Sequence, residues 1–482
     1  DLYIDEEDAQ DLVVEVERQL KKRQRGQAVR LEFEVGTSRF MRRFMTQEMN
    51  LEKEDMYQID GPLDMTVFFG FCGIKGYDHL RYPEAHPHSP WSMLELKRTP
   101  ETNIFDMIRE KDLLIHLPYE SFDESVVNFL YSAANDKDVL AIKQTLYRVS
   151  SSSPVVQALE KAVQNGKQVT VLMEVKARFD EANNILMARR LEKAGAHVIY
   201  GLVGLKTHSK CTLVIRREKD GIRRYVHVAT GNYNASTAKL YTDLGILTCN
   251  DRFGIDASAF FNLLSGYSDP PIWDSFIVAP INLRQRCIEL IDREIHFAKN
   301  GEDAHMIAKM NSLLDKGIIE KLYEASQAGV KIELIVRGIC VLIPGIPGVS
   351  DNITVRSIVG RFLEHSRIFW FRNGGREELY ISSADWMPRN LNDRVELMVP
   401  IEDPEIKRRL KQMVDIELSD NQKAHIMQAD GTWLKTISAE NQLCAQEYFQ
   451  KIAEKRDAED EMTLAQKLEP YTPVLGHGDG SD

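Results

Sequence analysis

Two histidines in this chain stand next to cations at spacings that suit phosphoryl chemistry. His208 lies in the segment 206–210 (KTHSK), directly before the apolar stretch 211–215. Because side chains alternate along a strand, His208 and Lys210 are expected on the same face. A neutral imidazole nitrogen is a nucleophile, and nearby ammonium groups favour the neutral ring while they attract phosphate oxygens. The segment therefore predicts attack on phosphorus by His208, with Lys206 and Lys210 binding the phosphate.

A second segment repeats this pattern with arginine in place of lysine. His365 and Arg367 lie in the segment 364–367 (EHSR), before the apolar stretch 368–371. Arginine can bind a phosphate group through two N–H groups at once. Either motif alone is more often structural than catalytic. Two such motifs, with the cation at the same offset, favour a shared catalytic site.

The elements around the two motifs also occur twice. From about residue 100, short apolar strands alternate with amphipathic helices, which predicts an α/β fold with a mostly parallel sheet. The near-constant spacing of its markers predicts a duplicated α/β domain. Ligands of open α/β sheets bind beyond the carboxyl ends of the strands, so two copies packed face to face would bring both histidines to one cleft. Three pairs of markers recur at offsets of 162 (280 − 118), 163 (329 − 166) and 157 (365 − 208) positions: Pro118 and Pro280, Gly166 and Gly329, His208 and His365.

The length of 482 residues predicts about three domains. Residues 1–95 are expected to form a small α+β head domain, with a helix, a strand and a second helix over 12–25, 28–35 and 38–49. The first α/β copy is predicted over 96–274. The second is predicted over 275–482, including an acidic carboxyl-terminal tail.

Further cations lie in or just after predicted strands. An arginine near an apolar strand is costly unless an anion or a carboxylate pairs with it. An ion pair with Glu174 or Glu396 is the structural alternative for any one arginine, but phosphate binding accounts better for the set. The cations are Lys143, Arg148, Arg178, Lys309, Arg337 and Arg394.

A polar turn follows the strand expected at 225–229. Gly231 and Asn232 would offer backbone N–H and amide groups to phosphate oxygens, although the same residues also form ordinary turns. Tyr241 could stack on a purine, and Asp243 could orient His208.

The composition excludes several other functions. The formal net charge of −12 gives no basic footprint for nucleic acid. Neither the G-x-x-x-x-G-K-[ST] phosphate loop nor the catalytic His-Arg-Asp of protein kinases is present. The six scattered cysteines favour neither a zinc site nor a disulfide framework and suit a reducing, cytoplasmic compartment. No apolar run has the length of a membrane span. The chain opens without Met, as a fragment would.

The motifs together resemble the bacterial polyphosphate kinases of the long, histidine-phosphorylated type. More broadly, the paired His-x-(Lys/Arg) motifs resemble the phospholipase D superfamily. The chain departs from the superfamily motif where an aspartate is expected seven residues after each histidine, since Ile215 and Arg372 stand there. The segments that carry the closer resemblance are 112–122 (DLLIHLPYESF), 143–150 (KQTLYRVS), 174–184 (EVKARFDEANN), 206–210 (KTHSK), 228–234 (VATGNYN) and 362–367 (FLEHSR).

This resemblance implies a fold and an activity. The fold would be two duplicated phospholipase D-like α/β domains packed face to face, preceded by the head domain and lacking the family's amino-terminal helical domain. The activity would be reversible transfer of the terminal phosphate of ATP to inorganic polyphosphate, with Mg²⁺ as cofactor and a phosphohistidine on His208. ATP, ADP and polyphosphate would be the partners, in a homo-oligomer (dimer or tetramer) of the cytoplasm with optional peripheral contact to the inner membrane.

The resemblance also implies roles for single residues. His365 would transfer protons and contact the nucleotide. Arg148 and Arg178 would lie near magnesium and phosphate, and Tyr241, Arg337 and Arg394 would contact the nucleotide. Two alternatives remain: a phospholipase D-like phosphodiesterase or nuclease, which passes phosphorus to water or an alcohol, and a non-catalytic protein that binds polyphosphate or nucleotide.

Overall fold

The structure is a computed structural model that describes residues 12–23, 26–94, 102–202, 204–266 and 272–468, with side chains described to residue 456. The chain divides into two compact units, residues 1–85 and 86–482. Among the described residues, no helix combines the length and the apolar composition that crossing a membrane requires.

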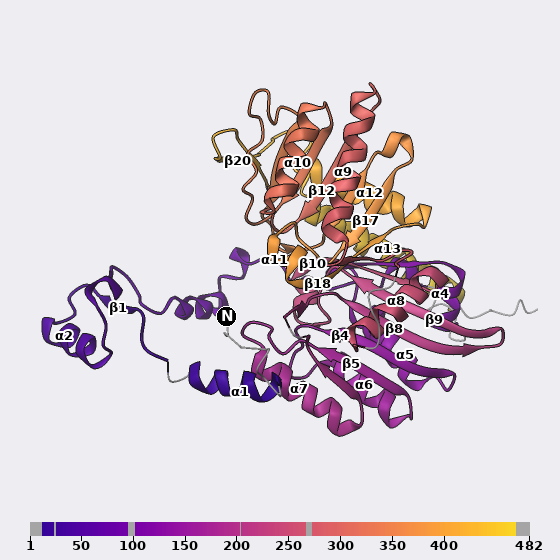
Figure 1. The fold of residues 1–482 in the computed structure, drawn as a ribbon, viewed down its shortest axis with the longest axis horizontal. Coiled ribbons are helices and arrows are strands. Elements are labelled where there is room, and N and C mark those ends of the chain that lie inside the picture. Colours follow the sequence, from indigo (N-terminus) through magenta and orange to yellow (C-terminus); the bar gives the residue numbers. More distant parts are fainter. Residues whose placement is uncertain (1–11, 24–25, 95–101, 203, 267–271, 469–482) are drawn as a thin grey trace, which may run out of the picture. The chain divides into compact units, whose positions relative to one another are not determined.

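The first unit holds a small parallel pair of strands joined by a helix. Strand β1 (Leu31–Glu34) pairs in parallel with β2 (Met56–Ile59), and α2 (Arg39–Glu48) connects them. The helix begins where the Ser38 hydroxyl accepts a hydrogen bond from the Met41 N–H (3.1 Å), since such a cap satisfies a free donor of the first turn. With α1 (Leu12–Arg23), these elements agree with the helix–strand–helix order expected from the sequence (Figure 1).

The second unit contains two mixed sheets with helices packed on them (Figure 1). In the first sheet the described strands run in the order β10-β9-β8-β4-β5-β6, with β3 paired to β10. The first-sheet elements are α4 (Ile104–Glu110), β3 (Leu113–Leu117), α5 (Asn128–Asn135), β4 (Val139–Leu146), α6 (Pro154–Gln164), β5 (Gln168–Met173), α7 (Glu181–Ala194), β6 (His197–Tyr200), β8 (Cys211–Glu218), β9 (Gly221–Ala229), β10 (Tyr241–Thr248) and α8 (Asp251–Leu264).

The second sheet repeats this arrangement. Its described strands run in the order β11-β18-β17-β16-β12-β13-β14-β19-β20. Its elements are β11 (Ile277–Ala279), α9 (Leu283–Lys299), β12 (His305–Met310), α10 (Lys316–Gln327), β13 (Lys331–Val336), β14 (Ile353–Ile358), β16 (Ile368–Phe371), β17 (Glu378–Ser382), α11 (Pro388–Asn392), β18 (Arg394–Pro400), α12 (Pro404–Leu418), β19 (Ala424–Met427), β20 (Trp433–Lys435) and α13 (Ala445–Leu468).

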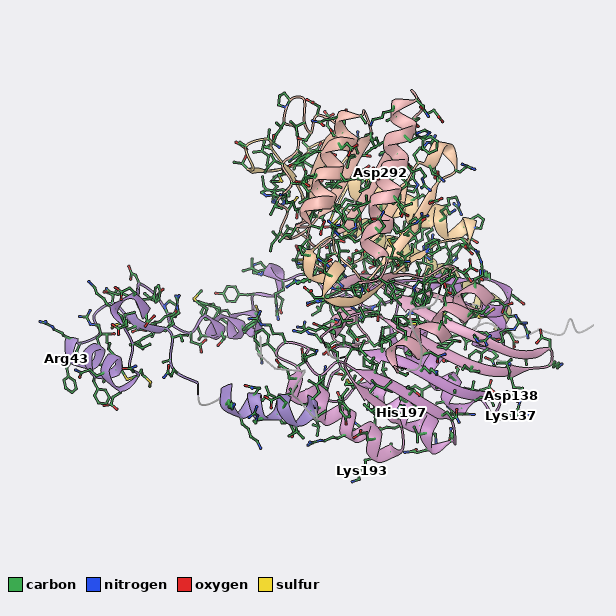
Figure 2. All side chains as sticks on the ribbon, viewed as in Figure 1. Arg43, Lys137, Asp138, Lys193, His197 and Asp292 are labelled. Atoms are coloured by element: carbon green, nitrogen blue, oxygen red, sulfur yellow. The ribbon has the colours of Figure 1, made fainter. Side chains whose placement is uncertain are left out.

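The helices bury one face and expose the other. On α9 and α10, Leu290 and Leu322 are almost fully buried in one apolar cluster with Met306 of β12. The outer faces carry charge, as with the exposed Lys193 of α7 and Asp292 of α9 (Figure 2). This pattern is that of helices with one apolar stripe on a sheet.

The predicted duplication is confirmed, but the prediction of a mostly parallel sheet is wrong. Strands β4-β5-β6 and β12-β13-β14 form the parallel part of each sheet. Apart from the short strands β7 and β15, the remaining described pairs in the two sheets are antiparallel, such as β8 with β9 and β16 with β17. Strands β8 and β9 are joined by the tight turn at 219–220, and a turn so short forces antiparallel pairing.

The two halves of this unit exchange short strands. Strand β7 (Lys206–Thr207), in the first half, pairs in parallel with β18 of the second sheet. Strand β15 (Leu363–Glu364), in the second half, pairs in parallel with β10 of the first sheet. Because His208 follows β7 and His365 follows β15, each histidine is carried onto the sheet of the other half.

Candidate active site

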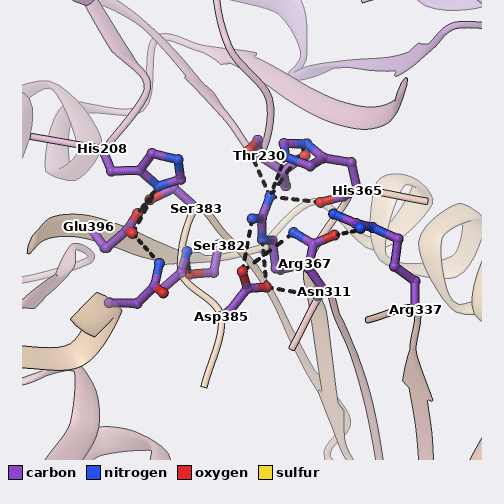
Figure 3. Close-up of polar contacts among 12 residues, drawn as sticks. His208, Thr230, Asn311, Arg337, His365, Arg367, Ser382, Ser383, Asp385 and Glu396 are labelled. Carbon is purple, nitrogen blue, oxygen red and sulfur yellow. Dashed lines mark hydrogen bonds and ion pairs between the residues drawn. The ribbon is translucent and has the colours of Figure 1, made fainter. Parts of the chain in front are cut away.

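Each histidine contacts a carboxylate that the other half supplies, as Figure 3 shows for His208 and Glu396. His208 with Glu396 is called the first half-site, and His365 with Asp243 the second half-site. His208 Nδ1 lies 2.8 and 2.9 Å from the carboxylate oxygens of Glu396 in β18. His365 Nδ1 lies 2.9 Å from both carboxylate oxygens of Asp243 in β10. All four side chains are buried. The prediction that Asp243 orients His208 is wrong, because the strand exchange places β10 beside β15.

A hydroxyl group supports each carboxylate in the same way. Thr230 Oγ1 donates to Asp243 (2.6 Å), and Ser383 Oγ donates to Glu396 (2.5 Å). The same hydroxyls accept from the N–H of Leu244 and of Leu397, each at 3.0 Å. Thr230 and Ser383 are therefore equivalent positions of the duplicated fold. Glu396 accepts a further bond from Asn390 Nδ2 (2.5 Å).

The cations of the two motifs occupy equivalent places but have different partners. The side chains of Lys210 and Arg367, each 2% exposed, both donate to the carbonyl oxygen of their own histidine. Arg367 also forms a two-point ion pair with Asp385 (3.1 and 3.2 Å). Lys210 forms no ion pair with a described residue. Asn232, two positions after Thr230, stands where the second half has Asp385, and its amide oxygen is buried without a hydrogen bond among the described residues.

Burial keeps His208 neutral. Burial, and then the charges of Lys210 and Arg394, hold the pKa of His208 well below 6.5. Burial also raises the pKa of Glu396, but Lys210 and Arg394 oppose that rise, and three donors surround its carboxylate. Because a neutral His208 can donate from only one ring nitrogen, we assign Nδ1–H of His208 as the donor to Glu396. This tautomer leaves the Nε2 lone pair free to act as a nucleophile.

In the second half-site, the pKa of the histidine is lowered less strongly than in the first. Burial lowers the pKa of His365, but Asp243 opposes that shift. Burial of Asp243 disfavours its charge, yet His365, Thr230 and Arg367 hold its pKa below the usual value. His365 consequently binds a proton more readily than His208 does.

An aromatic ring packs on each histidine. The Tyr147 ring meets His208 edge-on at 4.7 Å between centroids, and Lys210 Nζ lies 5.6 Å from the Tyr147 centroid. The Tyr241 ring lies 5.1 Å from His365. Sequence reasoning missed Tyr147, although an aromatic residue at a strand end, directly before Arg148, was a usable signal. Glu396 was considered only as a partner for arginines.

Arg394 and Arg337 both lie at the site but differ in their side-chain contacts. Arg394, half-buried, forms no hydrogen bond or ion pair with a described residue, while its charge acts on His208 and Lys210. Arg337 Nε donates to Asn311 Oδ1 (3.0 Å) and to the carbonyl oxygen of Glu364 (2.6 Å). Neither arginine forms an ion pair with Glu396, the alternative suggested by the sequence. Lys206 pairs with Arg394 in the β7–β18 ladder and is half-buried.

Arg148 and Arg178 lie next to each other, with Asp180 beside them. Arg148 pairs with Asp180 (Nε–Oδ2 3.0 Å) and donates to the carbonyl oxygen of Arg178 (3.1 Å). Arg178 is exposed and lies 5.0 Å from the Phe179 ring centroid. Guanidinium groups repel a cation, and no cluster of three metal-ligating side chains occurs in the described part of the chain. The expectation that these two arginines lie near magnesium and phosphate stays a prediction, and their guanidinium groups suit phosphate oxygens rather than the metal ion itself.

Lys143 is not brought to the site. Its ammonium reaches Asn262 Oδ1 in α8 (3.5 Å). Strands β4 and β12 end at equivalent points, Leu146 opposite Met173 and Met310 opposite Val336, so Lys309 corresponds to Thr145 and not to Lys143. The two lysines therefore lie in comparable strands of the two halves but at different positions along them. The predicted phosphate contact of Lys143 does not agree with this arrangement.

Comparison with known proteins identifies the family. Residues 1–71, 103–270 and 276–446 match the family descriptions "Polyphosphate kinase middle domain", "Polyphosphate kinase C-terminal domain 1" and "Polyphosphate kinase C-terminal domain 2". A polyphosphate kinase of Halalkalibacterium halodurans is 54% identical over 88% of this chain. The chain belongs to the polyphosphate kinase family. The family resemblance expected from the sequence is thereby confirmed.

Other members extend this comparison. A polyphosphate kinase of Thermosynechococcus vestitus is 48% identical over 90% of the chain. The crystal structure of a polyphosphate kinase from Porphyromonas gingivalis superposes with a TM-score of 0.81 at 34% identity, over 89% of this chain and 65% of that one. The chain spans 60% of the length of the Halalkalibacterium relative and 62% of the Thermosynechococcus relative.

Proposed function

We propose that this chain carries the catalytic site of an ATP–polyphosphate phosphotransferase in which His208 is the phosphorylated nucleophile. The observation that carries the proposal is the buried Nδ1 contact of His208 with Glu396, which leaves Nε2 free next to cations. Membership of the polyphosphate kinase family supplies the substrate class. The proposed substrates are ATP, ADP and inorganic polyphosphate.

The first step forms a phosphohistidine. His208 Nε2 attacks the terminal phosphorus of ATP; the P–N bond forms, the bond to the bridging oxygen breaks, and ADP leaves. The Nδ1 proton stays between His208 and Glu396, whose negative charge stabilises the phosphorylated ring. Lys210 and Arg394 lie close enough to neutralise charge on the transferring group, where such preorganised charge supplies most of the rate.

The second step passes the phosphoryl group to the polymer. A terminal phosphate oxygen of polyphosphate attacks the phosphorus, a P–O bond forms and the P–N bond breaks. One phosphoanhydride replaces another, so the reaction runs in both directions. His365, which Asp243 makes more basic than His208, is proposed to give a proton to the departing oxygen of ADP and to take it back in reverse.

The remaining site residues are proposed to bind the substrates. Tyr241, Arg337, Arg394, Asn232 and Lys206 would contact the nucleotide and its phosphates, and Arg148 and Arg178 the phosphate chain. Mg²⁺ would arrive with the nucleotide as part of the substrate. A dimer or tetramer, a cytoplasmic location and the division into domains at residues 95 and 274 also stay proposals.

A labelling experiment tests the function. The protein is incubated with γ-labelled ATP and magnesium, and the labelled protein is treated with acid or base. Label that resists base, is lost in acid and maps to His208 supports the proposal, and labelled long polymer supports the second step. Hydrolysis of a phosphodiester without labelling by ATP would favour the phosphodiesterase alternative. Binding of nucleotide or polyphosphate without label or turnover would favour the non-catalytic one.

A further inference from the structure

A charged side chain binds the backbone of the short strand before each histidine. It is an acceptor carboxylate in the first half and a donor guanidinium in the second. Before His208, the Thr207 N–H donates to the Glu174 carboxylate (2.7 Å). Before His365, the Glu364 carbonyl oxygen accepts from Arg337 (2.6 Å). Glu174 and Arg337 follow β5 and β13 directly, which makes them equivalent positions.

The strand before His365, β15, and the preceding Phe362 receive an additional set of contacts from Gln446, in the first turn of α13. Gln446 Oε1 accepts from the Phe362 N–H (2.9 Å), while Nε2 donates to the Phe362 carbonyl oxygen (2.9 Å) and to Glu364 Oε1 (2.6 Å). The side chain is 3% exposed, and its amide pairs with the backbone as a neighbouring strand would. A Cβ atom at residue 360 would lie 2.3 Å from Gln446 Oε1, so Gly360 permits the close approach.

Glu364 connects this amide to the strand that holds His365. Its other oxygen accepts from Lys309 Nζ (2.6 Å) and from Thr242 Oγ1 (2.8 Å). Thr242 Oγ1 also accepts from the His365 N–H (3.2 Å), and the residue after Thr242 is Asp243. The network therefore fixes both the backbone of His365 and the strand of its carboxylate. A buried carboxylate that loses one of its donors is costly, so removal of the Gln446 amide should shift the strand.

The start of α13 is itself anchored. The Ala445 N–H donates to Asp420 Oδ2 (2.7 Å), which fixes the helix end that carries Gln446.

We propose that Gln446 is a positioning residue for His365, through which α13 sets the geometry of the second half-site. This inference rests on the proposed role of His365 in turnover. Gln446 touches neither histidine ring and no substrate group is assigned to it. Its effect passes through Phe362, Glu364 and Thr242 to the backbone of His365.

The test compares Gln446→Met, which removes all three bonds at nearly constant volume, with Gln446→Glu, which retains an acceptor for the Phe362 N–H. The control is Gln450→Met, one turn later in α13, where the amide contacts neither Phe362 nor Glu364. Both Gln446 variants are expected to lower kcat for polymer formation by about ten- to a hundredfold, the range for a small misplacement of a catalytic group. KM for polyphosphate should not change, and Gln450→Met should stay within about twofold of wild type.

Combination with His365→Ala separates positioning from a general structural role. If Gln446 acts through His365, the double variant Gln446→Met with His365→Ala is no slower than His365→Ala alone. Additive losses, an equal loss in Gln450→Met, or a lowered melting temperature with unchanged kcat would overturn the inference. Full activity of His365→Ala would overturn the role of His365 as well, whereas loss in His365→Ala with none in Gln446→Met would overturn this inference alone.

Discussion

The two half-sites share one scaffold and differ in charge. In the first, Lys210 has no carboxylate partner among the described residues, because Asn232 stands at the equivalent place. In the second, Asp385 neutralises Arg367. A duplicated fold thus supplies two equal geometries, and a few side chains divide the work between them. The unpaired cation suits the half-site that is proposed to hold the transferring phosphoryl group.

The carboxylates differ in the same sense. Burial raises the pKa of Glu396. Burial also acts to raise the pKa of Asp243, but His365, Thr230 and Arg367 outweigh it and hold that pKa below its usual value. His208, beside Glu396, has a pKa well below 6.5. The pKa of His365, beside Asp243, is lowered less strongly. A nucleophile and a proton carrier have these two opposite requirements.

Replacement of each histidine by alanine should give the largest difference in activity between the two half-sites. His208→Ala is expected to abolish both reaction directions, by at least about 10⁴-fold, because the nucleophile is lost. His365→Ala should lower steady-state turnover but retain part of the label on His208. Steady-state rates and single-turnover labelling with γ-labelled ATP measure both effects. Wild-type activity in His208→Ala would refute the assignment of the nucleophile.

Neutral replacements of the two carboxylates come next. Glu396→Gln should slow phosphohistidine formation by about 10²- to 10⁴-fold, because the amide can hold the wrong tautomer of His208. Asp243→Asn should slow complete turnover but affect labelling less. Rapid-quench labelling compared with polymer formation separates the two steps. Equal effects of both variants on labelling would contradict the division of roles.

Making the half-sites alike in charge should have a smaller effect. Asn232→Asp gives the first half the carboxylate that the second half has at Asp385. The added negative charge should raise KM for ATP and polyphosphate by about tenfold, with the fold retained. Asn232→Ala is the matched control, since it removes the amide without adding charge. Unchanged KM in Asn232→Asp would show that this position does not influence the phosphate site.

The smallest effect concerns stability against pH. Both histidines have a pKa below 6.5 in the folded chain, His208 more strongly, so acid protonates them first in the unfolded chain. The free energy of unfolding should therefore fall as the pH drops below about 6.5, by up to about 1.4 kcal/mol per pH unit for each histidine that stays neutral. Urea unfolding between pH 7 and 5 should show a shallower decline for His208→Asn than for His365→Asn. Equal slopes would argue against the difference between the half-sites.

Much of the site could be predicted from the sequence because its signals are local. His208 and His365 have the same spacing to a cation, and the markers around them repeat at offsets of 157 to 163 positions. In each motif the cation follows its histidine by two residues, and in the structure Lys210 and Arg367 each donate to the carbonyl oxygen of that histidine. Family motifs then supplied the substrate class, and the head-domain elements followed from simple periodicity.

Only the tertiary structure decided which carboxylate meets which histidine. Alternating side chains fix the face of a strand but not the strand that lies next to it, and β7 and β15 pair across the two halves. That exchange gives His208 to Glu396 and His365 to Asp243. Tertiary packing also brings two distant segments together here: the Tyr147 ring packs on His208, and the Gln446 amide contacts the strand before His365. Lys143 lies outside the site. Its ammonium contacts Asn262 of α8, and this placement depends on the register between β4 and its neighbours, which no local pattern contains.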